Sequence, residues 1–221
     1  MAELKGLIFD MDGTLVDNLA YHFKAFEAYV QREGFTMLEP LSLKINGMHS
    51  NDIFPMLLGE EVVAEYGLDR LNREKEEVYR EMYRPHIKPI KGVIELMQAA
   101  KTAGVKCAIG SSGCRENVEM IIEGLGLADL IDASISGSDV THGKPHPEIF
   151  TKAHEALGLK AEECVVVEDA VNGILAGVAA GCKCIAVTTT ASAEVLTEEG
   201  ASMCFADYST VTIEKIANLL K

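Results

Sequence analysis

Residues 4–15 read LKGLIFDMDGTL: an apolar run that ends in two aspartates and a glycine. This pattern predicts a buried strand over residues 4–11, followed at once by a tight turn. Similar short apolar segments recur along the chain, and amphipathic stretches of helical length separate them. The further predicted strands are 105–112, 133–139, 163–169, 183–189 and 203–207, and the predicted helices among them are 92–104, 115–126, 146–158 and 171–181. The alternation predicts an α/β fold, a Rossmann-like parallel sheet with helices on both faces.

One stretch interrupts this alternation. About ninety residues separate the first two predicted strands, which is far more than one crossover helix needs. Their apolar spacing indicates only helices, at 20–33, 50–58, 59–66 and 69–84. We therefore expect two domains: a catalytic core formed by 1–16 and 88–221, and an inserted helical cap domain formed by 17–87.

The charge balance excludes some classes of partner. The 221 residues carry a formal net charge of −14 and hold no run rich in lysine or arginine, which argues against nucleic-acid binding. No apolar run approaches the roughly 18 residues of a membrane helix. The first strand pattern starts by residue 4 and leaves no room for a leader, so we expect a cytoplasmic protein. We also expect a monomer or weak oligomer.

The cysteines follow no zinc-binding spacing. The six residues are Cys107, Cys114, Cys164, Cys182, Cys184 and Cys204. Three of them lie in or beside apolar strand patterns, where a reduced thiol packs as a small hydrophobic group. We expect free thiols, with a metal or redox role as the less favoured alternative.

Polar groups follow the predicted strands where ligands of open α/β sheets bind. Asp10 and Asp12 follow the first strand, Ser111 ends the second, and Glu168-Asp169 ends the fourth. Carboxylates from adjacent strand ends would repel one another strongly unless a hard divalent cation such as Mg²⁺ lay among them. The segment after the third strand supplies Lys144, whose ammonium suits charge on a phosphoryl group. Asp10 and Asp12 flank one residue, so on an extended chain their side chains could point the same way.

Four motifs resemble those of the haloacid dehalogenase superfamily, in the same order and over essentially the whole chain. They are Asp10-x-Asp12-Gly13-Thr14-Leu15-x-Asp17, then Ser111, then Gly143-Lys144-Pro145-x-Pro147-x-Ile149-Phe150, then Glu168-Asp169-x-x-x-Gly173. The resemblance implies phosphoryl transfer through an aspartyl phosphate with magnesium, and a helical cap inserted after the first motif.

The resemblance also implies roles for individual residues. Asp10 would be the nucleophile and Asp12 the general acid and base, while Ser111 and Lys144 would bind phosphate. The metal would be held by Asp10, the main-chain carbonyl of Asp12, Glu168 and Asp169. Ser112 remains an alternative to Ser111, because the two serines are adjacent and a shift of one residue in matching the motif would give the phosphate-binding role to Ser112.

Within the superfamily, the stretch around His22 resembles β-phosphoglucomutase and its phosphatase relatives. His22 would position the general acid, Lys75 would contact substrate, and Gly47 would lie in a specificity loop. Lys75 also stands in the charged run Arg73-Glu74-Lys75-Glu76-Glu77, which is equally typical of a solvated helix face. The mutase carries an arginine shortly after the glycine, where this chain has Ser50.

These patterns favour a magnesium-dependent phosphatase whose partner is a small phosphorylated metabolite, a phosphomonoester such as a sugar phosphate. A hexose phosphomutase of the β-phosphoglucomutase type is the first alternative, and the missing arginine counts against it because the distal phosphate of a bisphosphate would lack its clamp. An inorganic pyrophosphatase and a binding module without enzymatic activity are the remaining alternatives.

Overall fold

The computed structural model describes residues 3–39 and 50–221, and its chain divides into two compact units. One unit comprises Met1–Asp17 and Ile87–Lys221, and the other comprises Asn18–His86. Each boundary lies one residue from the domain boundary expected from the sequence.

The first unit is built on one sheet of six parallel strands in the order β3-β2-β1-β4-β5-β6. The strands are β1 (Gly6–Phe9), β2 (Lys106–Gly110), β3 (Ala133–Ile135), β4 (Cys164–Glu168), β5 (Lys183–Val187) and β6 (Ala201–Phe205). Neighbouring strands run parallel, with Phe9 opposite Ile109 on one side and Val167 on the other. The predicted Rossmann-like α/β class is confirmed.

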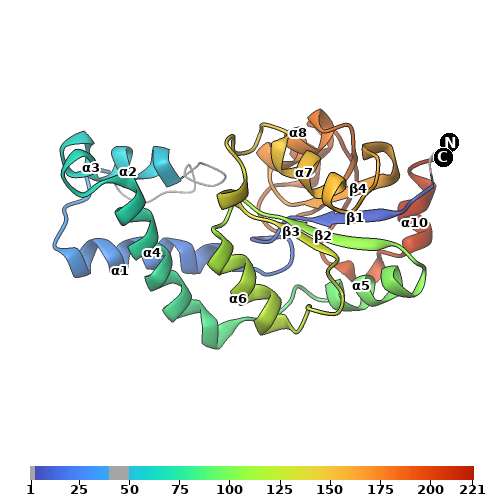
Figure 1. Cartoon of the computed structure of the whole chain (residues 1–221), viewed down its shortest axis with the longest axis horizontal. Coiled ribbons are helices and arrows are strands. Elements are labelled where there is room, and N and C mark those ends of the chain that lie inside the picture. Colours follow the sequence, from blue (N-terminus) through green and yellow to red (C-terminus); the bar gives the residue numbers. More distant parts are fainter. Residues whose placement is uncertain (1–2, 40–49) are drawn as a thin grey trace. The chain divides into compact units, whose positions relative to one another are not determined.

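The central strands are apolar because both of their faces are covered. Every residue of β1 and β4 is buried, including the run Val165, Val166 and Val167. β-Branched side chains suit such a strand, and burial on both faces removes the alternation of apolar and polar residues. Figure 1 shows α7 and α8 on one side of the sheet and α5 and α10 on the other. The helices of this unit are α5 (Val93–Thr102), α6 (Arg115–Leu125), α7 (Glu148–Ala156), α8 (Val171–Ala179), α9 (Ala193–Glu198) and α10 (Ile213–Asn218).

The second unit is helical, as the sequence predicts. Its elements are α1 (Leu19–Glu33), α2 (Ser50–Leu58), α3 (Glu60–Tyr66), α4 (Leu68–Tyr83) and the 3₁₀ turn η2 (Arg84–His86). Aromatic rings form much of its interior: Phe26 and Tyr29 of α1 lie 5.4 and 6.2 Å from Phe54 of α2 by ring centroids. Such tilted and edge-on pairs contribute beyond the area that they bury.

Two short helices, α9 and α10, escaped the sequence prediction. Each has six residues, too few for a 3.6-residue period to stand out. Both begin at a side-chain cap, Ser192 accepting from the Val195 amide and Thr212 from the Lys215 amide.

The cysteines behave as the sequence predicts. All six are free thiols, and those at 107, 164, 182 and 184 are buried. Among the described residues, no helix has both the length and the apolar character needed to cross a membrane.

Candidate active site

The site lies at the carboxyl edge of the sheet, where β1 and β4 end side by side. Asp10 follows β1, and its amide donates to the Val167 carbonyl of β4 at 2.9 Å. This places Asp10 beside Glu168, the last residue of β4, and Asp169. One carboxylate oxygen from each of the three lies within 4.8 Å of the others, and all three residues are buried. Two sequence segments more than 150 residues apart thus meet because their strands are neighbours.

Lys144 reaches this cluster from the segment that precedes α7. Its Nζ donates to Asp10 Oδ1 at 2.5 Å and to Glu168 Oε1 at 2.7 Å, and the side chain is only 7% exposed. The ring of Phe150 lies 4.7 Å from Nζ and adds a cation–π contact. The ammonium therefore joins two carboxylates that would otherwise repel each other.

Glu168 is held by three donors. Besides Lys144, the amides of Asp169 and Ala170 donate to its Oε2 at 2.8 and 2.9 Å. Position 173, in the first turn of α8, faces this carboxylate, and a Cβ there would overlap it. Position 173 therefore requires glycine because a side chain would have no room there, and not because of its backbone conformation.

Negative charge exceeds positive charge in this cluster. Burial raises the pKa of Asp10, the charges of Glu168 and Asp12 raise it further, and Lys144 opposes them. Burial likewise raises the pKa of Asp169 well above its ordinary value, with the charge of Glu168 adding to the effect. Three carboxylates lie near a single ammonium, so the fully ionised cluster has a net negative charge. A divalent cation would neutralise that charge. Oxygen-only donors suit a hard cation such as Mg²⁺.

The turn after β1 differs from the extended chain that the sequence argument assumed. The Leu15 amide donates to the Met11 carbonyl at 2.8 Å, so the backbone turns over residues 11–15. Asp12 is half-buried within this turn, whereas Asp10 is buried. Gly13 has φ +85°, a conformation that favours glycine, and a Cβ there would overlap the Asp169 carboxylate.

The two serines after β2 differ in exposure. Ser111 is buried, and its Oγ accepts from the Gly113 amide at 3.0 Å. An oxygen that accepts leaves the hydroxyl proton to donate elsewhere. Ser112 is exposed. The structure thus separates two residues that the sequence left interchangeable.

The sequence prediction missed Thr189, Thr190 and Tyr208, which support this edge together with Thr14 of the first motif. Thr190 and Thr14 donate their hydroxyls to Asp169, the second at 3.2 Å, and Thr189 donates to the Gly13 carbonyl. Tyr208 donates to the Thr14 carbonyl at 2.9 Å. The run of threonines at 188–190 was a readable signal, because it directly follows β5 at the same edge of the sheet.

The predicted substrate-binding residues His22 and Lys75 both lie in the helical unit. The His22 ring of α1 stacks on the Tyr79 ring of α4, with centroids 3.8 Å apart and planes 8° apart. Lys75 of α4 is buried rather than solvated, so the interpretation of its charged run as an exposed face is wrong for this residue. Its Nζ contacts Glu76 at 2.5 Å and lies 4.4 Å from the centre of the Phe26 ring. Gly47 lies outside the described residues.

Comparisons with known proteins identify the family of this chain. A family model described as haloacid dehalogenase-like hydrolase matches residues 7–187. The chain belongs to this family. It is 30% identical over 224 residues to the phosphorylated carbohydrates phosphatase of Thermotoga maritima, with 99% of each chain covered. Two longer relatives from Arabidopsis thaliana also match, and the chain spans only 21% and 50% of their lengths.

Solved structures of the family share the fold. A family IA, variant 3 hydrolase from Entamoeba histolytica superposes with a TM-score of 0.87 at 27% identity, over 98% of this chain and 99% of the other. β-Phosphoglucomutase from Clostridium difficile superposes with a TM-score of 0.81 over 100% and 97% of the chains. At 22% identity, this second likeness shows the fold alone.

Proposed function

We propose that this chain is a magnesium-dependent phosphatase that hydrolyses small phosphomonoesters, sugar phosphates among them, through a phosphorylated Asp10. One observation carries the proposal: Lys144 joins Asp10 to Glu168 beside Asp169, at the sheet edge where such folds bind ligands. The phosphatase relative from Thermotoga maritima, which matches over the full length, supports the substrate class.

The chain's own residues account for each chemical step. An oxygen of Asp10 attacks phosphorus, a P–O bond to Asp10 forms, and the ester P–O bond breaks. Asp12 gives its proton to the leaving alcohol oxygen and then accepts a proton from the attacking water. That water displaces Asp10, which releases inorganic phosphate and restores the carboxylate. Lys144 and the Ser111 hydroxyl hold the phosphoryl oxygens throughout.

Asp10, the carbonyl of Asp12, Glu168 and Asp169 would hold Mg²⁺. When bound, the ion would neutralise the excess carboxylate charge and the charge of the phosphoryl group. Glu168 also accepts three hydrogen bonds, so it would orient Lys144 as well as offer a ligand to the ion.

We assign the cap residues to substrate binding. His22 and Lys75 come from α1 and α4 of the helical unit, and Gly47 precedes α2. Ser112, exposed next to Ser111, belongs to the same set. In this proposal Lys75 is held by Glu76 and Phe26, so its ammonium has a defined direction before substrate binds.

A panel of phosphate esters tests the proposal. We expect phosphate release from hexose and hexitol phosphates with Mg²⁺, loss of release with excess EDTA, and recovery when Mg²⁺ is returned. Asp10→Asn should abolish release, whereas Asp129→Asn, an exposed aspartate of the same unit, should retain it. Full activity of Asp10→Asn would refute the nucleophile assignment.

The mutase and pyrophosphatase alternatives are separated by their products. β-Glucose 1-phosphate with a trace of β-glucose 1,6-bisphosphate gives glucose 6-phosphate if the chain is a mutase and free phosphate if it is a phosphatase. Faster turnover of pyrophosphate than of any ester would indicate the pyrophosphatase.

A further inference from the structure

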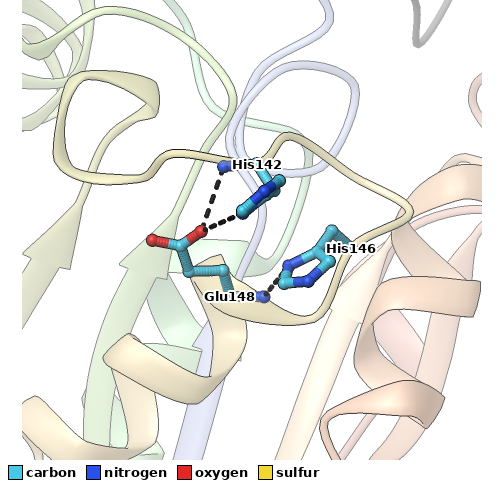
Figure 2. Close-up of side chains that lie close together, drawn as sticks. All are labelled: His142, His146 and Glu148. Carbon is cyan, nitrogen blue, oxygen red and sulfur yellow. Dashed lines mark hydrogen bonds and ion pairs between the residues drawn. The ribbon is translucent and has the colours of Figure 1, made fainter.

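A second cluster of ligand-bearing side chains lies in the segment that leads into α7. His142, His146 and Glu148 each offer one ligand atom, and the three atoms lie within 4.8 Å of one another. Figure 2 shows both imidazole rings beside the start of the helix, with the Glu148 carboxylate hydrogen-bonded to His142. Two imidazoles and a carboxylate form a donor set that suits Zn²⁺, Ni²⁺ or Cu²⁺, whereas the all-oxygen set around Asp10 suits Mg²⁺.

The spacing of one pair is already close to that of two ligands on one ion. His142 Nδ1 lies 3.1 Å from Glu148 Oε2. Nitrogen and oxygen ligands lie about 2.0–2.2 Å from zinc, so two of them at a tetrahedral angle are about 3.4 Å apart. The pair therefore needs to open by only a few tenths of an ångström.

The third ligand needs a larger but local adjustment. The rings of His142 and His146 lie 4.5 Å apart by centroids and are tilted by 33°. His146 Nδ1 accepts from the Glu148 amide at 3.3 Å, a long hydrogen bond that a metal–nitrogen bond could replace. Both histidines are exposed, so their rings can rotate and an ion can reach them.

The carboxylate itself is fixed. The amides of Thr141 and His142 donate to Glu148 at 3.1 and 3.0 Å, and Lys152 Nζ donates to its Oε1 at 2.7 Å. These bonds lower the pKa of Glu148 to about 2, the Lys152 bond most of all. Lys152 binds Oε1 and is 41% exposed, so solvent screens its repulsion of a cation near Oε2.

The hydrogen bonds of Glu148 by themselves explain how the loop is anchored to α7, but they do not require two imidazoles at the same carboxylate. We propose that His142, His146 and Glu148 bind one divalent transition-metal ion of the zinc class, at a site separate from the acidic cluster at the sheet edge. Lys144 lies between the two histidines in sequence. The bound ion would therefore link the two ends of the segment that carries Lys144.

Calorimetric titration with Zn²⁺ in saturating Mg²⁺ tests the site, because Mg²⁺ occupies the oxygen-only cluster. We expect one Zn²⁺ per chain, and binding at least about 10-fold weaker in the double variant His142→Gln/His146→Gln. His86→Gln, an exposed histidine of the helical unit, is the matched control and should bind as the wild type does. Absence of Zn²⁺ binding by the wild type, or equal binding by the double variant, would overturn the proposal.

A second measurement on the unaltered protein guards against a variant that misfolds. Paramagnetic Ni²⁺, added with Mg²⁺ present, should broaden the imidazole proton signals of His142 and His146 at stoichiometric amounts and leave those of His86 sharp. Broadening of every histidine alike, or first at His86, would count against the site.

Discussion

Replacement of Gly173 by alanine tests the geometry around Glu168 most directly. A Cβ at position 173 would lie 2.5 Å from Glu168 Oε2 and nearer still to Oε1 and Cδ, whereas ordinary contacts begin at 3.4 Å. Glu168 Oε1 would start closest to that Cβ, so the carboxylate or the first turn of α8 must move by about 1.7 Å to reach an ordinary contact of 3.4 Å. A displacement of about 1 Å in a site can already reduce turnover about 100-fold, and Glu168 would pass the shift to Lys144, which it holds at 2.7 Å.

The effect on stability is the difference of two opposing terms. Overpacking of a filled site costs about 1–3 kcal/mol, while alanine in place of glycine favours a helix by about 1 kcal/mol. We expect a net loss of about 0–2 kcal/mol, a fall in melting temperature of at most about 8 °C for a domain of this size. Phosphate release should thus fall far more than stability.

A double-mutant cycle with Glu168→Asp supplies the control. The shorter side chain withdraws its carboxylate from position 173, so in that background Gly173→Ala should stabilise the protein instead of destabilising it. Thermal unfolding of the four proteins, followed by circular dichroism, measures the sign. A Gly173→Ala protein that keeps wild-type turnover and unfolds at a higher temperature would refute the reasoning, as would an effect of the same sign in both backgrounds.

Three further perturbations probe other parts of the first unit. Lys144→Met should lower the free energy of unfolding in urea without divalent cations by about 3 kcal/mol, because it leaves buried carboxylates unpaired; an unchanged midpoint would contradict the pairing. A thiol reagent should modify at most Cys114 and Cys204 in the native chain and all six cysteines in denaturant, because the other four are buried; rapid native reaction of more than two would disprove it. Burial raises the pKa of Asp139, but the hydrogen bonds from Ser136 together with the charge and hydrogen bond of Arg115 outweigh burial and leave the pKa lowered. The stability that Asp139 contributes is therefore present above its unfolded pKa near 3.8 and lost as pH falls below it, so the difference in melting temperature between wild type and Asp139→Asn should vanish in acid.

The main elements could be predicted because their signals are local. The apolar run of β4 and the helical spacing within 92–104 depend on neighbours a few residues apart. The short helix α9 could not be recognised from period alone. Its cap, Ser192, and the glycine at 200 were the only local indications.

The candidate site shows the same division. Asp10 and Asp169 were predicted to meet because strand ends in a parallel sheet share an edge, and the structure brings their carboxylates together. The contribution of Thr190 was missed, since nothing in its own neighbourhood indicates that it donates to Asp169. Asp12 was expected on an extended chain, but it lies in the turn formed by residues 11–15.

By itself the sequence determined the order of the strands and of the longer helices, the place of the helical insertion and the residue types at the ends of β1, β2 and β4. Only the tertiary structure decided that one ammonium joins two of the carboxylates and that Ser111 is buried while Ser112 is exposed. It also decided that the lack of a side chain at Gly173 leaves room for the Glu168 carboxylate. The physical reason is range. Periodicity and capping are interactions along the chain, whereas burial, charge pairing and steric room arise between segments that only the folded sheet brings within a few ångströms.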